Sequence, residues 1–183
     1  MRAPRAMIST ARLRLRELEA GDAAFILELL TDPSWIRYIG DKGIRTLDDA
    51  QRYIEDGPRQ MYWRLGFGLY LVELLATGEP AGICGLIRRD ALEDVDLGFA
   101  FLPRFRGHGY AIEAASAVMC HARDVLALPR LVAIATADNE RSTRLLVRLG
   151  FAFERTIRLS KDGAELALYG ADVSAKVPRG AGA

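Results

Sequence analysis

The sequence predicts a mixed α/β (α+β) domain in which helices flank a central, largely antiparallel twisted sheet. Residues 11–16 alternate apolar and charged side chains, which is the period-two pattern of a half-buried strand. Residues 66–75 and 81–87 form two further apolar runs on either side of a Thr-Gly-Glu-Pro turn signature. Apolar residues recur at spacings of three and four within 112–126, as they do on the buried face of a helix.

Turn and cap residues place the elements of the N-terminal half. Glu19-Ala20-Gly21-Asp22 supplies a turn and a helix cap, and Asp32-Pro33 ends the helix that follows. Thr46 or Asp48 begins a second helix, which we expect Gly57-Pro58 to stop. The expected elements are a strand at 11–16, helices at about 22–32 and 46–56, and an antiparallel meander of strands at 66–75, 81–87 and 95–102.

Similar signals divide the C-terminal half. Leu128-Pro129 breaks a helix, Asn139 caps a shorter one, and Gly150 stands where a left-handed helix stop is expected. A closing hairpin turns around Lys161-Asp162-Gly163. The expected elements are a helix that ends near 126, a strand at 131–135, a helix at 139–149, and strands at 151–159 and 165–173.

Length and charge limit the class of protein. We expect one domain at 8–173, and we expect the small, polar, glycine-containing tail 174–183 to be disordered. A formal net charge of +1 disfavours nucleic-acid or membrane binding through bulk electrostatics, and no apolar run is long enough to span a bilayer. Cys84 and Cys120 lie in apolar surroundings, which predicts buried, reduced thiols and a cytoplasmic protein.

The most specific motif is the loop Arg106-Gly107-His108-Gly109-Tyr110-Ala111, between the strand at 95–102 and the next helix. Free N–H groups at a helix start, approached through glycines, bind anions. The loop lacks the Lys-Ser/Thr ending of a nucleoside-triphosphate loop and the G-x-G-x-x-G order of a dinucleotide fold. It therefore predicts another phosphate-bearing cofactor; a tight turn with glycines for geometry alone is the alternative.

In their order and spacing, several segments resemble the GNAT superfamily of acetyl-CoA-dependent N-acetyltransferases, most strongly its branch of ribosomal-protein N-terminal acetyltransferases (the RimJ/RimL type). The resemblance extends over nearly the whole chain and implies a sheet that is splayed at the cofactor site, with acetyl-CoA as cosubstrate. The matching segments are 10–16, 78–82, 96–99, Leu102-Pro103, Arg106 to Ala114, 139–142 and 149–151.

The resemblance also implies the cofactor contacts. The family pattern Gln/Arg-x-x-Gly-x-Gly/Ala falls on Arg106, Gly109 and Ala111, so backbone N–H groups from about Arg106 to Ala111 would hold the CoA pyrophosphate. The pantetheine arm would pair with the backbone of 99–102, beside 131–135, and an N–H near Phe101 would polarise the acyl carbonyl. The expected cofactor-binding residues are Phe99, Phe101, Leu102, Arg106, Gly107, His108, Gly109, Tyr110, Ala111, Asn139, Ser142 and Arg144.

Two residues are the expected catalysts. The resemblance puts the Ser142 hydroxyl near the CoA sulfur, where it could protonate the departing thiolate. Many family members have a tyrosine for this proton, and Leu146 stands at that position here. A reaction without a dedicated acid is the alternative. Asp96, where the family often carries Glu, is the expected general base; a solvated strand entrance is the alternative. Arg144 either pairs with the CoA 3′-phosphate or belongs to a solvated helix face.

The resemblance implies transfer of the acetyl group of acetyl-CoA to a primary amine, either a protein N-terminal α-amine or a small-molecule amine. Neither cysteine belongs to a Cys-His arrangement, which favours direct attack in a ternary complex. Alternatives are a CoA-binding sensor without turnover and an acetyltransferase for an antibiotic, a polyamine or aminoacyl-tRNA. A homodimer is left open.

The acceptor and metal predictions rest on single residues. His108 and His121 have no neighbouring ligand pair, so no metal is expected. The acceptor pocket is expected between the first two helices and their loop. Its candidate walls are Trp35, Tyr38, Ile39, Trp63 and Tyr70, although aromatic residues there are equally compatible with core packing.

Overall fold

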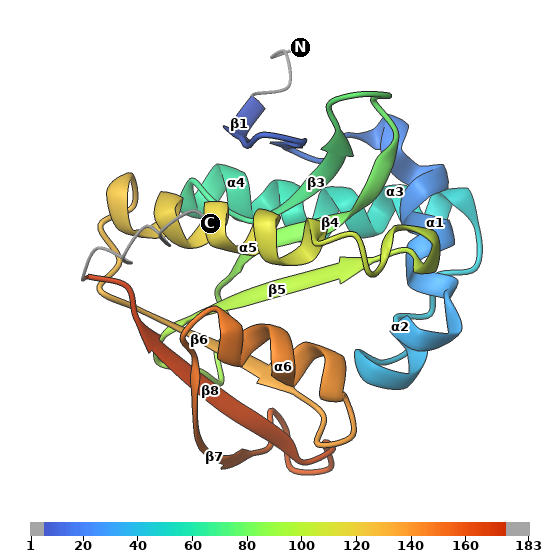
Figure 1. Cartoon of the computed structure of the whole chain (residues 1–183). Coiled ribbons are helices and arrows are strands. Elements are labelled where there is room, and N and C mark those ends of the chain that lie inside the picture. Colours follow the sequence, from blue (N-terminus) through green and yellow to red (C-terminus); the bar gives the residue numbers. More distant parts are fainter. Residues whose placement is uncertain (1–5, 175–183) are drawn as a thin grey trace.

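Eight strands form one twisted sheet in the computed structural model, which describes residues 6–174 (Figure 1). The strand order is β1-β2-β3-β4-β5-β6-β8-β7, and every neighbouring pair is antiparallel except β5 and β6. The predicted mixed, largely antiparallel sheet is confirmed. The strands are β1 (Ala6–Ser9), β2 (Leu13–Arg16), β3 (Leu69–Leu74), β4 (Pro80–Ile87), β5 (Val95–Phe101), β6 (Arg130–Ala135), β7 (Ala152–Ile157) and β8 (Leu166–Asp172).

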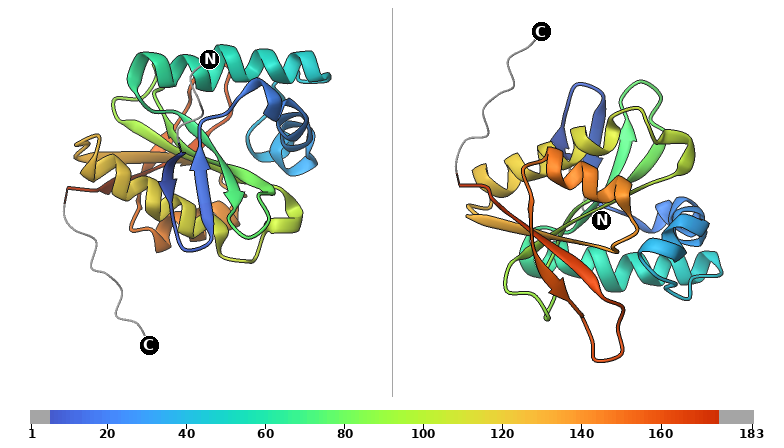
Figure 2. Two further views of the ribbon diagram at one scale, coloured as in Figure 1. Left: turned by 90° about the horizontal axis from the view of Figure 1, so that it is seen from above. Right: turned by 60° about the horizontal axis from the view of Figure 1, so that its bottom comes forward.

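Helices cover both faces of the sheet (Figure 2). On one face α3 contacts α1 and continues through a π turn into α4, while α5 packs on the other face against β4 and β5, and α6 against β6. The helices and single turns are η1 (Ala20–Asp22), α1 (Ala23–Thr31), α2 (Pro33–Tyr38), α3 (Leu47–Ile54), η2 (Glu55–Arg59), α4 (Gln60–Leu65), η3 (Pro103–Phe105), α5 (Tyr110–Asp124) and α6 (Glu140–Arg148).

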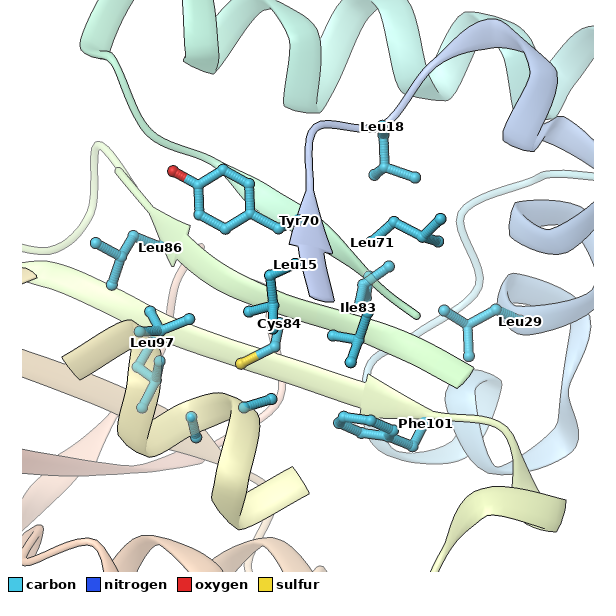
Figure 3. Packing of buried hydrophobic residues seen from close by; sticks show 14 of the residues in the cluster. Leu15, Leu18, Leu29, Tyr70, Leu71, Ile83, Cys84, Leu86, Leu97 and Phe101 are labelled. Carbon is cyan, nitrogen blue, oxygen red and sulfur yellow. The ribbon is translucent and has the colours of Figure 1, made fainter. Parts of the chain in front are cut away.

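The main core lies between the sheet and these two helix layers. Figure 3 shows part of it: Leu29 extends from α1 toward β3 and β4, and Leu97 extends from β5 toward α5. Both side chains are almost fully buried. Burial of a leucine side chain stabilises a fold by about 1.5–3 kcal/mol, so this packing fixes the positions of β4 and β5.

The predicted cap at Thr46 and the predicted stop at Gly150 are confirmed, whereas Asp22 precedes α1 without a side-chain cap bond and one other predicted stop is wrong. Thr46 begins α3, where its hydroxyl accepts from the Asp49 N–H at 3.1 Å, and Gly150 has a φ of +91° after α6. Gly57-Pro58 does not stop the second helix, because the chain passes through the π turn η2 with Pro58 buried inside it. A π turn displaces the backbone hydrogen bonds by one residue, which accommodates a proline that lacks an N–H. The helix then ends at Gly66, whose φ is +77°.

Other differences lie near the N-terminus. The strand predicted from residue 11 begins at Leu13, because Thr10 forms the β1–β2 turn and its hydroxyl accepts from the Leu13 N–H at 3.0 Å. Asp32-Pro33 ends α1 as predicted, but it also begins α2: Asp32 caps the Ser34 N–H at 3.0 Å, and proline suits a first helical position.

The predictions for the cysteines and the tail have separate outcomes. Cys84 is buried as predicted, whereas Cys120 is exposed on α5, so that prediction was wrong. The predicted disordered tail lies outside the described residues, apart from Ser174. Between residues 6 and 174 no helix is long and apolar enough to cross a membrane.

Candidate active site

The site begins where the two parallel strands of the sheet separate. β5 and β6 are paired only at Val95 with Leu131 and at Asp96 with Val132. Beyond these pairs β5 is bonded only to β4, and β6 only to β8. Residues 98–100 of β5 are partly exposed although β5 is an inner strand. We call the space between 97–101 of β5 and 133–135 of β6 the strand split; Figure 1 shows the two strands diverging there.

Peptide groups of β5 face the strand split in a regular alternation. The Leu102 N–H donates to the Ala81 carbonyl on the β4 side at 3.1 Å, and no bulge interrupts the β4–β5 register. Because alternate residues of an antiparallel strand direct their peptide groups to opposite sides, the N–H groups of Phe99 and Phe101 face the split. They offer hydrogen-bond donors to an extended ligand beside β5.

Leu102 does not share this role. Its N–H is bonded to Ala81 and its carbonyl accepts from the Phe105 N–H at 3.0 Å. Both backbone groups of Leu102 are therefore already bonded within the fold, to β4 and to the turn η3, and its pairing with pantetheine stays a prediction. The side chain of Leu102 is 1% exposed and belongs to the core.

The loop after β5 has the expected backbone form. Gly107 and Gly109 both have a φ of +80°, a left-handed conformation that favours glycine. Gly109 is the N-cap of α5, and the Glu113 N–H donates to the Gly109 carbonyl at 3.2 Å. The N–H groups of Tyr110, Ala111 and Ile112 precede this first intrahelical bond, so they are available to an anion.

The backbone and the side chain of Arg106 both form hydrogen bonds within the fold, and its contact with the cofactor stays a prediction. Its N–H donates to the Pro103 carbonyl at 3.2 Å, so the predicted row of free N–H groups starts after it. Its side chain turns away from the loop: Nε donates to the Phe101 carbonyl at 2.9 Å, and NH2 donates to the Ser34 hydroxyl at 2.6 Å. Arg106 thus joins the end of β5 to α2 rather than pointing at a phosphate.

Asp96 lies at the closed end of the strand split. Its side chain is almost completely buried, and Oδ2 accepts from Arg89 Nε at 2.6 Å. Its Oδ1 has no hydrogen-bond partner within the described residues. Burial raises the pKa of Asp96 against the opposing effects of Arg89 and of the Ile134 N–H of β6. The result is a buried carboxyl with an enhanced affinity for a proton.

Helix α6 follows β6, the other strand of the split. Asn139 caps it as predicted, with its side-chain oxygen accepting from the Ser142 N–H at 3.2 Å. Ser142 is partly exposed, whereas Leu146 is buried in the core. Arg144 is exposed and pairs with Glu140 at 3.1 Å, which agrees with the solvated-face alternative and leaves the guanidinium accessible.

The family follows from a direct comparison. Residues 12–152 match the model of the acetyltransferase (GNAT) domain. The chain belongs to the GNAT acetyltransferase family. With N-acetyltransferases among its relatives, it is an acetyl-CoA-dependent acetyltransferase.

Two relatives and two solved structures illustrate the likeness. An uncharacterized N-acetyltransferase of Bacillus subtilis, YoaA, is 27% identical over 153 residues, covering 83% of this chain and 86% of the relative. A spermidine N(1)-acetyltransferase of Escherichia coli is 26% identical, covering 81% and 77%. An acetyltransferase structure from Agrobacterium tumefaciens has a TM-score of 0.77 at 25% identity, covering 90% and 92%. RimL, a ribosomal-protein α-N-acetyltransferase solved with coenzyme A, has a TM-score of 0.77 at 17% identity, covering 90% and 96%.

The acceptor walls predicted for this GNAT chain do not form one pocket. Trp63 is 85% exposed on α4, whereas Tyr70 is fully buried and stacks on Tyr62, with 5.6 Å between ring centroids. Trp35 is also a core residue. Where the pocket was expected, a shallow hollow is lined by none of the five predicted walls. Its residues are Lys42, Gly43, Ile44, Asp49, Arg52, Tyr53, Asp56 and Gly57.

Helix α2 is tied to the open end of the strand split. Arg37 of α2 pairs at 2.9 Å with Asp138, in the loop between β6 and α6. The Arg37 guanidinium also lies 5.0 Å from the ring centroid of Tyr38, which is partly exposed. Of the predicted walls, Tyr38 therefore lies beside the GNAT site, and Ile39, which follows it, is exposed.

Three polar residues around the GNAT loop were given no role from the sequence. Thr10 and Arg12 of the β1–β2 turn both contact Glu113 of α5. They stood within segments that carried the family resemblance, which is the signal that could have singled them out.

No group of three or more potential metal-ligating side chains occurs in the described part of the chain.

Proposed function

We propose that this acetyltransferase transfers the acetyl group to a primary amine by direct attack in a ternary complex. The observation that carries the proposal is the strand split of β5 and β6, followed along the chain by the loop at 107–112 with its free N–H groups. An anion-binding loop suits a pyrophosphate, and unpaired strand N–H groups suit an extended amide-containing arm. Coenzyme A combines these two chemical features in one molecule.

The donor would lie along β5. The N–H groups of 107–112 would hold the pyrophosphate, and Phe99 and Phe101 would hydrogen-bond the pantetheine arm. Asn139, Ser142 and Arg144 would approach from α6. An N–H at Phe101 would polarise the acetyl carbonyl, because a fixed dipole facing the developing oxyanion lowers the barrier. Binding also turns a bimolecular encounter into an oriented reaction.

Asp96 would act as the general base, directly or through a water molecule. The amine nitrogen attacks the carbonyl carbon, the C–S bond breaks, and the nitrogen loses a proton. The buried Oδ1 of Asp96 would take this proton, and the raised pKa of its carboxyl favours the transfer. The leaving thiolate would take its proton from the Ser142 hydroxyl or from solvent.

The acceptor is a protein N-terminal α-amine or a small-molecule amine. An α-amine, with an ordinary pKa of about 8, reaches the neutral form at neutral pH far more readily than a lysine amine, whose pKa is about 10.4. A sequence relative named for spermidine and a fold neighbour named for a ribosomal protein represent the two acceptor types.

Thiol release from acetyl-CoA tests the proposal. Wild-type protein is mixed with acetyl-CoA and a panel of N-terminal peptides, polyamines, aminoglycosides and amino acids. We expect thiol release only with an amine present, and a product heavier by one acetyl group. Absence of acceptor-dependent release across the panel, or an acetyl group held on the protein during turnover, would contradict the proposal.

A further inference from the structure

The β1–β2 turn contacts the loop after β5, although the two segments are 96 residues apart in the sequence. Arg12 NH1 donates to the His108 carbonyl at 2.9 Å, in the middle of the loop. The guanidinium carbon also lies 4.7 Å from the ring centroid of Tyr110, the first residue of α5. Figure 2 shows the β1–β2 hairpin beside α5, in agreement with the contacts between these elements. One side chain thus contacts both the loop and the start of the helix.

The remaining loop contacts converge on the same place. The rings of His108 and Tyr110 stack with 5.6 Å between centroids, and His108 Nδ1 lies 2.9 Å from the Arg106 carbonyl. A Cβ on Gly109 would lie 3.3 Å from Arg12 NH2. Arg12 is therefore packed against the loop and restricts its conformation.

Glu113 is the second partner of Arg12. Its Oε2 accepts from Arg12 Nε at 2.7 Å, while its Oε1 accepts from the Thr10 hydroxyl at 2.6 Å and from the Arg12 N–H at 3.0 Å. Burial raises the pKa of Glu113, but the bonds from Thr10 and Arg12 outweigh burial and lower it below its ordinary value. The carboxyl is therefore ionised at neutral pH.

An ionised Glu113 affects the anion site because of its position. It is the fourth residue of α5, in the turn whose free N–H groups face the loop. Without a neighbouring cation, its charge would oppose a bound pyrophosphate. The guanidinium of Arg12 compensates that charge and holds the loop carbonyl at the same time.

We propose that Arg12 is a positioning residue for the cofactor: it holds the His108 carbonyl in place and neutralises Glu113, so that the α5 N-terminus keeps its attraction for the CoA pyrophosphate. The inference rests on the proposed placement of CoA at this loop. It assigns Arg12 no direct contact with a phosphate, since Nε and NH2 of its guanidinium already contact Glu113 and NH1 donates to the His108 carbonyl.

Three variants test the inference: Arg12→Met, Glu113→Gln and the double variant. CoA affinity is measured by calorimetric titration, with melting temperatures and the KM values for acetyl-CoA and for acceptor. Arg12→Met should weaken CoA binding at least tenfold and raise the KM for acetyl-CoA alone. Glu113→Gln should leave CoA affinity equal or tighter. The double variant should regain at least threefold over Arg12→Met, because the uncompensated carboxylate is gone.

Arg158→Met is the matched control. Arg158 also pairs with a glutamate, Glu165 at 2.9 Å, but in the β7–β8 hairpin at the other edge of the sheet. The Arg158→Met variant should bind CoA with the affinity of the wild-type protein.

Several results would overturn the assignment of Arg12. Unchanged CoA affinity in Arg12→Met would show that Arg12 does not position the loop for CoA. A double variant no better than Arg12→Met contradicts the compensation of the Glu113 charge, and equal losses in all three variants in step with the melting temperature indicate a purely structural pair. Wild-type protein that binds CoA but acetylates no amine would remove the proposed reaction while leaving this inference intact, because its readout is CoA affinity.

Discussion

Replacing Gly109 with alanine separates backbone strain from cofactor binding. Gly109 has a φ of +80° and is the N-cap of α5. A side chain in this left-handed conformation costs about 1–2 kcal/mol. In a chain of this size, 1 kcal/mol corresponds to about 2–4 °C in melting temperature, so Gly109→Ala should melt about 2–8 °C below the wild-type protein.

The cofactor adds a second, larger effect. At a CoA concentration of about 100 times Kd, binding stabilises the wild-type protein by about 2.7 kcal/mol, or about 5–11 °C. If relaxation of the strained loop turns its N–H groups away and weakens binding 100-fold, the same CoA concentration stabilises the variant by only about 0.4 kcal/mol, or about 1 °C. The assay is a thermal melt with and without CoA.

Gly78→Ala is the control for this experiment. Gly78, in the β3–β4 turn, has a φ of +73°, and a Cβ there would meet nothing within 4 Å. It should lose a similar amount of stability and keep the full CoA shift. A wild-type CoA shift in Gly109→Ala would refute the placement of the pyrophosphate at this loop.

Three further substitutions test the other roles. Asp96→Asn should lower kcat by about 100-fold or more without changing CoA affinity. Because the base must be ionised, wild-type kcat should fall as the pH decreases through the pKa of Asp96, which lies above the ordinary value of an aspartate. This pH dependence should be absent in the variant. Ser142→Ala should keep the CoA melting shift and lower kcat, and normal turnover would remove its role as acid. Arg106→Met should lose about 1–3 kcal/mol in urea unfolding, because the Phe101 carbonyl and the Ser34 hydroxyl lose their donor; unchanged stability would contradict that link.

Local chemistry made much of the fold predictable from the sequence. Thr46 and Asn139 cap their helices because their side-chain oxygens reach N–H groups three residues away. Gly107 and Gly109 adopt positive φ, as the loop motif suggested. The helix stop predicted at Gly57-Pro58 was wrong, because a π turn retains a proline that an ordinary helix would exclude.

The rest of the site depends on contacts between distant segments. Arg106 is bound to Ser34, 72 residues away, and Arg12 to Glu113, 101 residues away. No local pattern encodes such pairs. The strand split was expected only through the family resemblance, because its cause, the loss of pairing after Asp96 and Val132, is a property of the assembled sheet.

Residue-resolved amide hydrogen exchange with and without CoA tests the placement of the cofactor most directly. The N–H groups of Phe99 and Phe101 face the strand split, whereas that of Ala100 is directed to β4 by the alternation along β5. We predict that CoA slows exchange at Phe99 and Phe101 and leaves the rate at Ala100 almost unchanged. Unaltered exchange at Phe99 and Phe101 under saturating CoA would contradict a cofactor bound between β5 and β6.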